Sequence, residues 1–167
     1  MHPHKEIDVI SVMIEGRVSH EGSLAHGQGL ETGDVQVQRA GGEGFSHNEV
    51  NPDNTKNRMI QLWVLPEEEG RPAGYKYYSP ALTGTTRVYG GNKQQSETFA
   101  SNTVIEITKL QAGSKIKLSN ETICYITSGT AEFKDNSHTH QAKDGDLIRS
   151  SNAEIQATTN TTMIVVS

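Results

Sequence analysis

The chain lacks long hydrophobic runs, and this absence limits where it can reside. None of its 167 residues belongs to a stretch of eighteen consecutive apolar residues, which excludes a membrane-spanning helix. The N-terminus reads Met1-His2-Pro3-His4, where a secretory signal would place basic and then apolar residues. We therefore expect a cytoplasmic protein.

Basic clusters and cysteines are also scarce. Fifteen Lys and Arg against twenty Asp and Glu give a net charge of −5, and no basic run of five residues occurs. Direct binding of nucleic acid is therefore disfavoured. The single cysteine, Cys124, cannot form an intramolecular disulfide. Its apolar neighbours predict a buried, unreactive thiol on a strand.

Helical periodicity is missing, while short β-branched runs and sixteen glycines are present. This pattern predicts an all-β protein with many tight turns. The expected strands cover residues 7–15, 35–40, 58–65, 103–110, 114–118, 122–128, 146–149 and 162–166. Residues 66–95 differ in composition, with an acidic run followed by the closely spaced Tyr75, Tyr77 and Tyr78. We interpret that segment as an interdomain connection.

The two sides of this connection resemble each other. A hydrophobic strand leads to Gly16 and then to Gly33-Asp34, and a second strand leads to Gly129 and then to Gly145-Asp146. The separations between the glycines are 17 and 16 residues. This repeat predicts two copies of one small β-module. We expect an N-terminal module, with the start of the linker, over residues 1–85 and a C-terminal module over residues 86–167.

Two pairs of residues carry the strongest chemical signal. His2 and His4 lie two residues apart, as do His47 and Glu49, so each pair would point to one face of a strand. If the two segments lie on neighbouring strands, three imidazoles and one carboxylate converge. Such a set suits a divalent transition metal and leaves two octahedral positions open.

The remaining histidines fit a metal site less well. His138 and His140 lie in the polar hairpin 134–141, where we expect solvated side chains. His20 and His26 lie in the matching hairpin of the first half, and the same interpretation applies to them, with a role at a barrel mouth left open. In the second half, the positions equivalent to the four ligands carry Lys115, Lys117, Thr159 and Thr161, which are poor metal ligands. The C-terminal module is therefore expected to be degenerate, without metal ligands.

These features together resemble a known family. The motifs His2-Pro3-His4, Glu15-Gly16, Gly33-Asp34, Ala40-Gly41 and His47-Asn48-Glu49 are similar to those of the cupin superfamily, specifically pirin and its bacterial relatives. The resemblance implies a bicupin of two double-stranded β-helix (jelly-roll) barrels. It implies one metal, held in the first barrel by His2, His4, His47 and Glu49. Asp8 stands where the wider cupin pattern tends to have Glu, so no fifth ligand is expected from it.

The family carries further strands before the His-Pro-His motif, so the resemblance implies a first barrel that is truncated at its N-terminus. The missing edge could be supplied by another subunit, and an unpaired edge favours a homodimer. The resemblance also implies a quercetin 2,3-dioxygenase-like oxidoreductase that cleaves a flavonol with O₂ and releases CO. Glu49 is then the candidate catalytic base, and iron is the favoured metal, with manganese, nickel, copper, zinc and cobalt as alternatives. The other hypotheses are a non-enzymatic metal-binding regulator, similar to a transcriptional co-regulator, and an inactive truncated paralogue.

Overall fold

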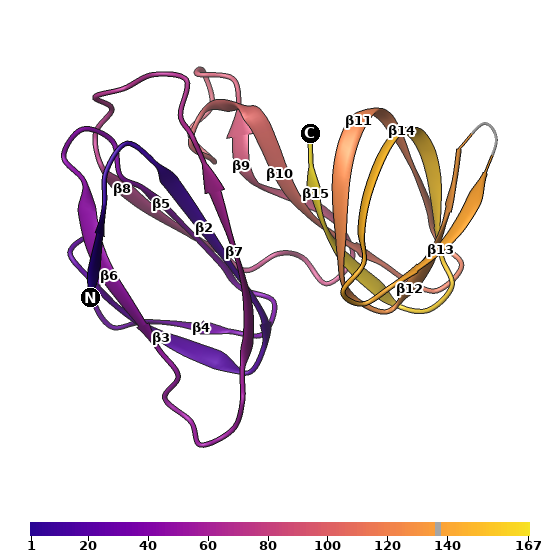
Figure 1. Ribbon diagram of the computed structural model, residues 1–167, viewed down its shortest axis with the longest axis horizontal. Coiled ribbons are helices and arrows are strands. Elements are labelled where there is room, and N and C mark those ends of the chain that lie inside the picture. Colours follow the sequence, from indigo (N-terminus) through magenta and orange to yellow (C-terminus); the bar gives the residue numbers. More distant parts are fainter. Residues whose placement is uncertain (136–137) are drawn as a thin grey trace. The chain divides into compact units, whose positions relative to one another are not determined.

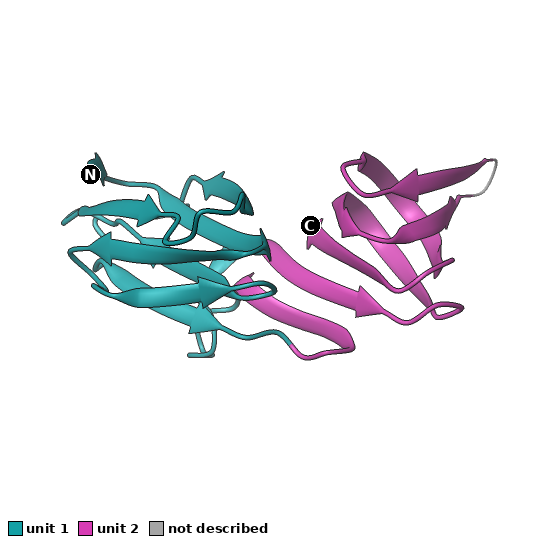
Figure 2. Cartoon of the chain, turned by 90° about the horizontal axis from the view of Figure 1, so that it is seen from below, with its two compact units in different colours: residues 1–80, 91–102 teal, residues 81–90, 103–167 magenta. Residues whose placement is uncertain are grey.

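A computed structural model describes residues 1–135 and 138–167 (Figure 1). All regular secondary structure in those ranges is β-strand, as the composition predicts. The described residues contain no helix with the length and apolar character needed to cross a membrane. The chain divides into two compact units, residues 1–80 with 91–102 and residues 81–90 with 103–167 (Figure 2). We call them unit 1 and unit 2 and describe each by itself.

Unit 1 contains two four-stranded sheets. The first has the order β1-β6-β3-β4, and the second has the order β7-β2-β5-β8. The strands of the first sheet are β1 (His2–His4), β3 (Arg17–Gly22), β4 (Gln28–Glu31) and β6 (Phe45–Val50). Those of the second sheet are β2 (Asp8–Glu15), β5 (Val35–Arg39), β7 (Arg58–Val64) and β8 (Gly74–Tyr78).

Unit 2 is built on a seven-stranded sheet with the order β13-β12-β14-β11-β15-β10-β9. Its strands are β9 (Gly84–Gly91), β10 (Ser101–Leu110), β11 (Lys115–Ser128), β12 (Thr130–Lys134), β13 (Thr139–Lys143), β14 (Leu147–Ala157) and β15 (Thr161–Val166). Its hydrophobic core includes Ile126, Phe133, Ile155 and Met163, which are at most 2% exposed. Unit 2 is therefore held together by an ordinary apolar core.

The second sheet of unit 1 has a different interior. Strand β5 is buried along its whole length, yet its sequence alternates Val35 and Val37 with Gln36 and Gln38. Directly paired residues share a face, and Gln36 pairs with Ser11 of β2 while Gln38 pairs with Val9. One face of β5 therefore carries buried amides, which require hydrogen-bond partners inside the protein.

The internal repeat has the same turn in both halves. Gly16, Gly33, Gly129 and Gly145 all adopt positive φ. In the first half, Met13 N–H donates to Asp34 O, and Gly33 N–H donates to Met13 O. In the second half, Ile126 N–H donates to Asp146 O, and Gly145 N–H donates to Ile126 O. Each aspartate side chain also accepts from a backbone N–H three residues earlier, in both cases at 2.9 Å.

Other sequence expectations need correction. The segment 66–95 is not a plain connection, because it contains β8, which pairs with β5, and β9 of the seven-stranded sheet. The two segments 114–118 and 122–128 form one strand, β11, with a register shift between Leu118 and Glu121. The boundary expected after residue 85 falls inside β9, and the compact units interleave between residues 81 and 102. The description of each half as a cupin module stays a prediction.

The two turn glycines of unit 2 allow a matched test. A Cβ at Gly129 would lie 2.1 Å from the backbone oxygen of Asn160, whereas a Cβ at Gly145 would meet no atom within 4 Å. Both residues have positive φ. We expect Gly145→Ala to cost about 1–2 kcal/mol of stability from strain alone, and Gly129→Ala to cost about 4 kcal/mol or more because backbone must also move. Urea unfolding of both variants measures the difference, and equal losses would contradict the packing around Gly129.

Cys124 is 1% exposed, and burial raises the pKa of its thiol to about 11. The thiol is therefore protonated at pH 8 and shielded from reagents. We expect no reaction of the native protein with a chromogenic disulfide reagent at that pH, and one equivalent of reaction per chain in denaturant. Rapid labelling of the native protein would show that this part of unit 2 opens readily.

Candidate metal centre

Pairing of β1 with β6 brings the predicted histidines together. The two strands are antiparallel, and His2 lies directly opposite His47 while His4 lies opposite Phe45. The two segments therefore lie on neighbouring strands, which is the condition that the sequence analysis set for convergence. His2, His4 and His47 form one group whose ligating nitrogen atoms all lie within 4.8 Å of one another.

The spacing of these nitrogen atoms fits a first-row metal. His47 Nε2 lies 3.1 Å from His4 Nε2 and 3.0 Å from His2 Nε2. Two imidazole nitrogens bound to one metal at about 2.05 Å are about 2.9 Å apart for a right angle and about 3.3 Å apart for a tetrahedral angle. Both distances from His47 Nε2 fall between these values. The three side chains thus fit one metal without a large movement.

The electrostatics of the cluster keep its nitrogen lone pairs available. Burial, followed by the neighbouring His2 and His4, lowers the pKa of His47 to about 4. Burial and the nearby His2 also lower the pKa of His4 from its ordinary value. Both rings are therefore neutral at pH 7, which is the form that binds a metal.

Two aromatic rings, those of Phe45 and Trp63, lie against histidines of the cluster. The ring of Phe45 lies 5.0 Å from that of His4 and 5.2 Å from that of His47, between centroids. Trp63 of β7 meets His4 edge-on at 5.2 Å and is 59% exposed. The site therefore combines a buried apolar flank with an aromatic surface that is open to solvent.

Glu49 follows His47 on the same face of β6, as the spacing predicts. Its carboxylate is not part of the group of three histidines. Oε1 accepts from the Ser11 hydroxyl at 2.9 Å and from Gln36 Nε2 at 2.5 Å, and Oε2 accepts from Gln61 Nε2 at 3.1 Å. The assignment of Glu49 as a ligand stays a prediction.

The glutamines beside Glu49 extend this network to the aromatic residues. Gln61 Oε1 accepts from Trp63 Nε1 at 2.8 Å, and Gln36 Oε1 accepts from the Tyr75 hydroxyl at 3.2 Å. Burial raises the pKa of Tyr75 to about 12, so its hydroxyl stays protonated and able to donate. Neutral groups from β2, β5 and β7 hold the carboxylate in place.

Sequence reasoning placed His20 wrongly. His20 was expected in a solvated hairpin, but it is fully buried on β3, opposite Glu49 of β6. Its ring centroid lies 5.6 Å from that of His47. The alternation of buried Val18 and buried His20 along β3 is the signal that could have revealed it. His26 is exposed, as expected.

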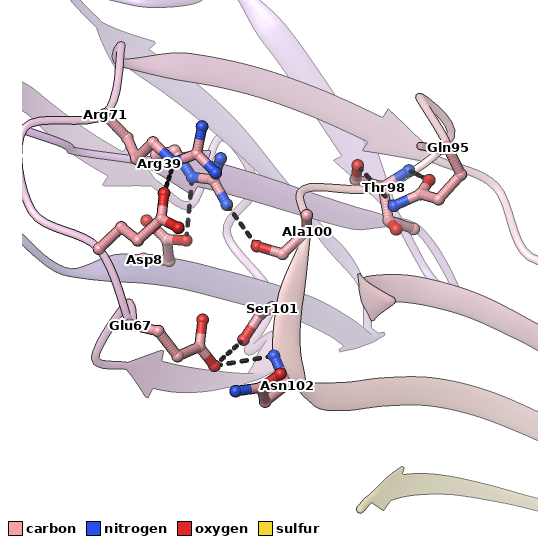
Figure 3. Close-up of polar contacts among 10 residues, drawn as sticks. Asp8, Arg39, Glu67, Arg71, Gln95, Thr98, Ala100, Ser101 and Asn102 are labelled. Carbon is pink, nitrogen blue, oxygen red and sulfur yellow. Dashed lines mark hydrogen bonds and ion pairs between the residues drawn. The ribbon is translucent and has the colours of Figure 1, made fainter. Parts of the chain in front are cut away.

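The other candidate residues lie apart from the cluster. His138 and His140 are exposed, with ring centroids 6.0 Å apart; residues 136 and 137 of their hairpin lie outside the described ranges. Asp8 is fully buried and pairs with Arg39, whose Nε donates to Asp8 Oδ2 at 3.3 Å (Figure 3). Arg39 also donates to the Ala100 carbonyl oxygen at 3.0 Å. Asp8 is thus committed to an ion pair.

An open pocket of about 400 Å³ lies beside this ion pair and contains none of the histidines. Its charged side chains are paired, because Glu68 contacts both Arg71 and Lys93. Glu67 accepts from the Ser101 hydroxyl and from the backbone N–H of Asn102 (Figure 3). The histidine cluster, which lies outside this pocket, therefore stays the candidate metal centre of unit 1.

Comparison with known proteins agrees with this geometry. The sequence model of the Pirin family matches residues 1–64, which include all four expected ligands. A Pseudomonas aeruginosa protein named "Putative quercetin 2,3-dioxygenase" is 31% identical over 156 residues, covering 89% of this chain and 67% of that protein. Quercetin 2,3-dioxygenase of Escherichia coli is 34% identical over 76 residues, which is 45% of this chain and only 32% of that enzyme.

A solved structure shows the same fold. The structure of the bacterial pirin YhhW from Escherichia coli in complex with nickel(II) superposes with a TM-score of 0.82 and 21% sequence identity. The superposition covers 99% of this chain and 73% of that protein. The family model, the relative aligned over most of both chains and the shared fold lead to one conclusion: this chain belongs to the pirin family.

Proposed function

We propose that the chain is a bicupin whose N-terminal barrel binds one divalent transition metal and acts as a dioxygenase on a flavonol or a similar planar chelator. The observation that carries the proposal is the convergence of three imidazoles on one point. Names of relatives support the reaction class, since two of them are called quercetin 2,3-dioxygenase.

His2, His4 and His47 would hold the metal, with Glu49 as the fourth ligand. Their nitrogen and oxygen donors accept several first-row ions, and we propose iron as the physiological one. A nickel complex is known for the structural relative YhhW. When bound, the metal would supply Lewis acidity at the chelating oxygens of the substrate and a site for electron exchange with O₂.

Glu49 has a second part in the proposal. A flavonol must lose its hydroxyl proton, and Glu49 is the carboxylate that β6 presents on the same face as His47. Its carboxylate accepts from neutral hydroxyl and amide groups, which hold it in position. A positioned base of this kind contributes about 10²–10⁴-fold to a rate.

Trp63 suits the binding of a planar aromatic substrate. Its indole is more than half exposed, contacts the ring of the ligand His4, and is fixed by its hydrogen bond to Gln61. Stacking on this indole would hold an aromatic ring beside the metal. The same glutamine contacts Glu49, so one network orients both the substrate surface and the base.

Metal content tests the ligand assignment. We expect untagged wild-type protein to bind one equivalent of Fe²⁺ or Ni²⁺, and His47→Ala to lose this metal because His47 is the centre of the cluster. His138→Ala is the matched control, since it removes an exposed histidine from unit 2, and it should keep the full equivalent. Elemental mass spectrometry after dialysis measures both.

The outcome that contradicts the assignment is equally plain. His47→Ala protein that retains a full equivalent would show that the metal binds elsewhere. Wild-type protein that stays free of metal after reconstitution would show that metal has no part in the function.

Turnover tests the enzymatic part. We expect metal-loaded protein to bleach the visible absorbance of quercetin under air with release of CO, and Glu49→Gln to lower kcat at least about 100-fold because the base is lost. Glu132→Gln is the control, because Glu132 lies on β12 of unit 2, where its carboxylate accepts from Gln141 Nε2. Stoichiometric metal without any turnover would instead favour a binding or regulatory role.

A further inference from the structure

Two buried polar side chains lie behind the metal cluster and link one ligand to the backbone. Gln38 of β5 and His20 of β3 are both 0% exposed. The Gln38 amide lies between two imidazoles, with Oε1 3.0 Å from His20 Nε2 and Nε2 3.0 Å from His47 Nδ1. At the far end, His20 Nδ1 lies 2.5 Å from the carbonyl oxygen of Ala25. The chain of contacts therefore runs Ala25, His20, Gln38, His47.

The Ala25 carbonyl determines which nitrogen of His20 carries the hydrogen. A carbonyl oxygen only accepts, so His20 Nδ1 must carry the hydrogen of this bond. A neutral imidazole has one N–H group, so His20 Nε2 is then a lone pair that accepts. The alternative, with both nitrogens protonated, would place a positive charge on a fully buried ring, which is costly without a paired anion.

The orientation of the Gln38 amide follows from this acceptor. A neutral His20 needs the NH₂ group of Gln38 to face its Nε2. A half-turn of the amide from the orientation given above exchanges its nitrogen and oxygen and keeps both 3.0 Å contacts. After that half-turn, Gln38 Oε1 faces His47 Nδ1 and accepts its hydrogen. His47 then has no hydrogen on Nε2, the nitrogen that points to His2 and His4.

Packing holds His20 in the position that this chain of contacts needs. A Cβ on Gly22 would lie only 2.7 Å from His20 Cε1 and 3.1 Å from Nε2, so the ring fills the space that the glycine leaves. The ring centroid of Tyr75 lies 5.8 Å from that of His20. The imidazole therefore cannot turn over easily to exchange its two nitrogens.

We propose that Gln38, oriented by His20 and the Ala25 carbonyl, is a positioning residue that fixes His47 in the Nδ1–H tautomer and so directs its Nε2 lone pair at the metal. The proposal rests on the metal site proposed above and adds two residues to it. Neither residue touches the metal. Their effect is to remove the cost of shifting a hydrogen on His47 before the metal binds, and groups in such supporting positions change metal affinity by about 10–100-fold.

The tautomer can be read directly in metal-free protein. Long-range ¹H–¹⁵N spectra of the ¹⁵N-histidine-labelled chain at neutral pH distinguish an Nδ1–H from an Nε2–H imidazole. We expect the Nδ1–H form for His47 in wild-type protein, and a substantial Nε2–H population in Gln38→Leu and in His20→Phe. An Nε2–H tautomer for His47 in wild-type protein would overturn the inference, whatever metal the chain binds.

Nickel affinity provides the second measurement, by titration calorimetry with Ni²⁺ as the probe. We expect Gln38→Leu to weaken binding at least tenfold. Gln38→Glu should bind as tightly as wild type or more tightly, because one carboxylate oxygen accepts from His47 Nδ1–H while the other pairs with a protonated His20. Thermal unfolding of the metal-free variants confirms that both are folded. Equal weakening by Leu and Glu would mean that Gln38 acts through packing, which overturns the inference.

The two proposals fail in different ways. A wild-type chain that shows the Nδ1–H tautomer but binds no Ni²⁺ would overturn the proposed metal function. It would also overturn the proposal that Gln38 positions His47 for metal binding. A chain that binds Ni²⁺ equally well with Gln38→Leu would leave the metal site standing and overturn this inference alone.

Discussion

The structure of unit 1 depends on hydrogen bonds among polar groups that its strands bury. Ser11, His20, Gln36, Gln38 and His47 are all fully buried. Each group left without a partner would cost about 1–3 kcal/mol. Ser11 and Gln36 therefore bond to Glu49, and Gln38 contacts His20 and His47. Unit 2 has no comparable requirement in its main core, which is apolar. The interior of unit 1 therefore depends on hydrogen bonds between buried polar groups as well as on apolar packing.

One strand organises both halves of this network. The alternation along β5 sends Gln36 toward Glu49 and Gln38 toward His47. Because β6 presents His47 and Glu49 from one face, two amides spaced two residues apart can support two predicted ligands spaced two residues apart. The register between β1 and β6 then completes the cluster by setting His2 opposite His47. The proposed oxygenase chemistry uses all of these positions, with the exposed ring of Trp63 beside them.

The sequence predicted the parts of this site that depend on local spacing. A separation of two residues on a strand is enough to pair His2 with His4, and the repeated Gly-Asp turn is visible in both halves of the chain. Strand β8 was missed because its tyrosines follow an acidic turn, and its place in the sheet is fixed by pairing with β5 rather than by its own composition. His20 and Gln38 were missed for a similar reason, since their contacts join β3, β5 and β6.

The central claim is that three imidazoles of unit 1 share one metal. Metal-edge X-ray absorption of the Fe²⁺-reconstituted chain tests it most directly, because imidazole rings give a characteristic outer-shell scattering from which their number is fitted. The account predicts three imidazoles, with oxygen as the remaining atoms bound to the metal. A fit with one imidazole or none in protein that carries a full equivalent of metal would contradict it.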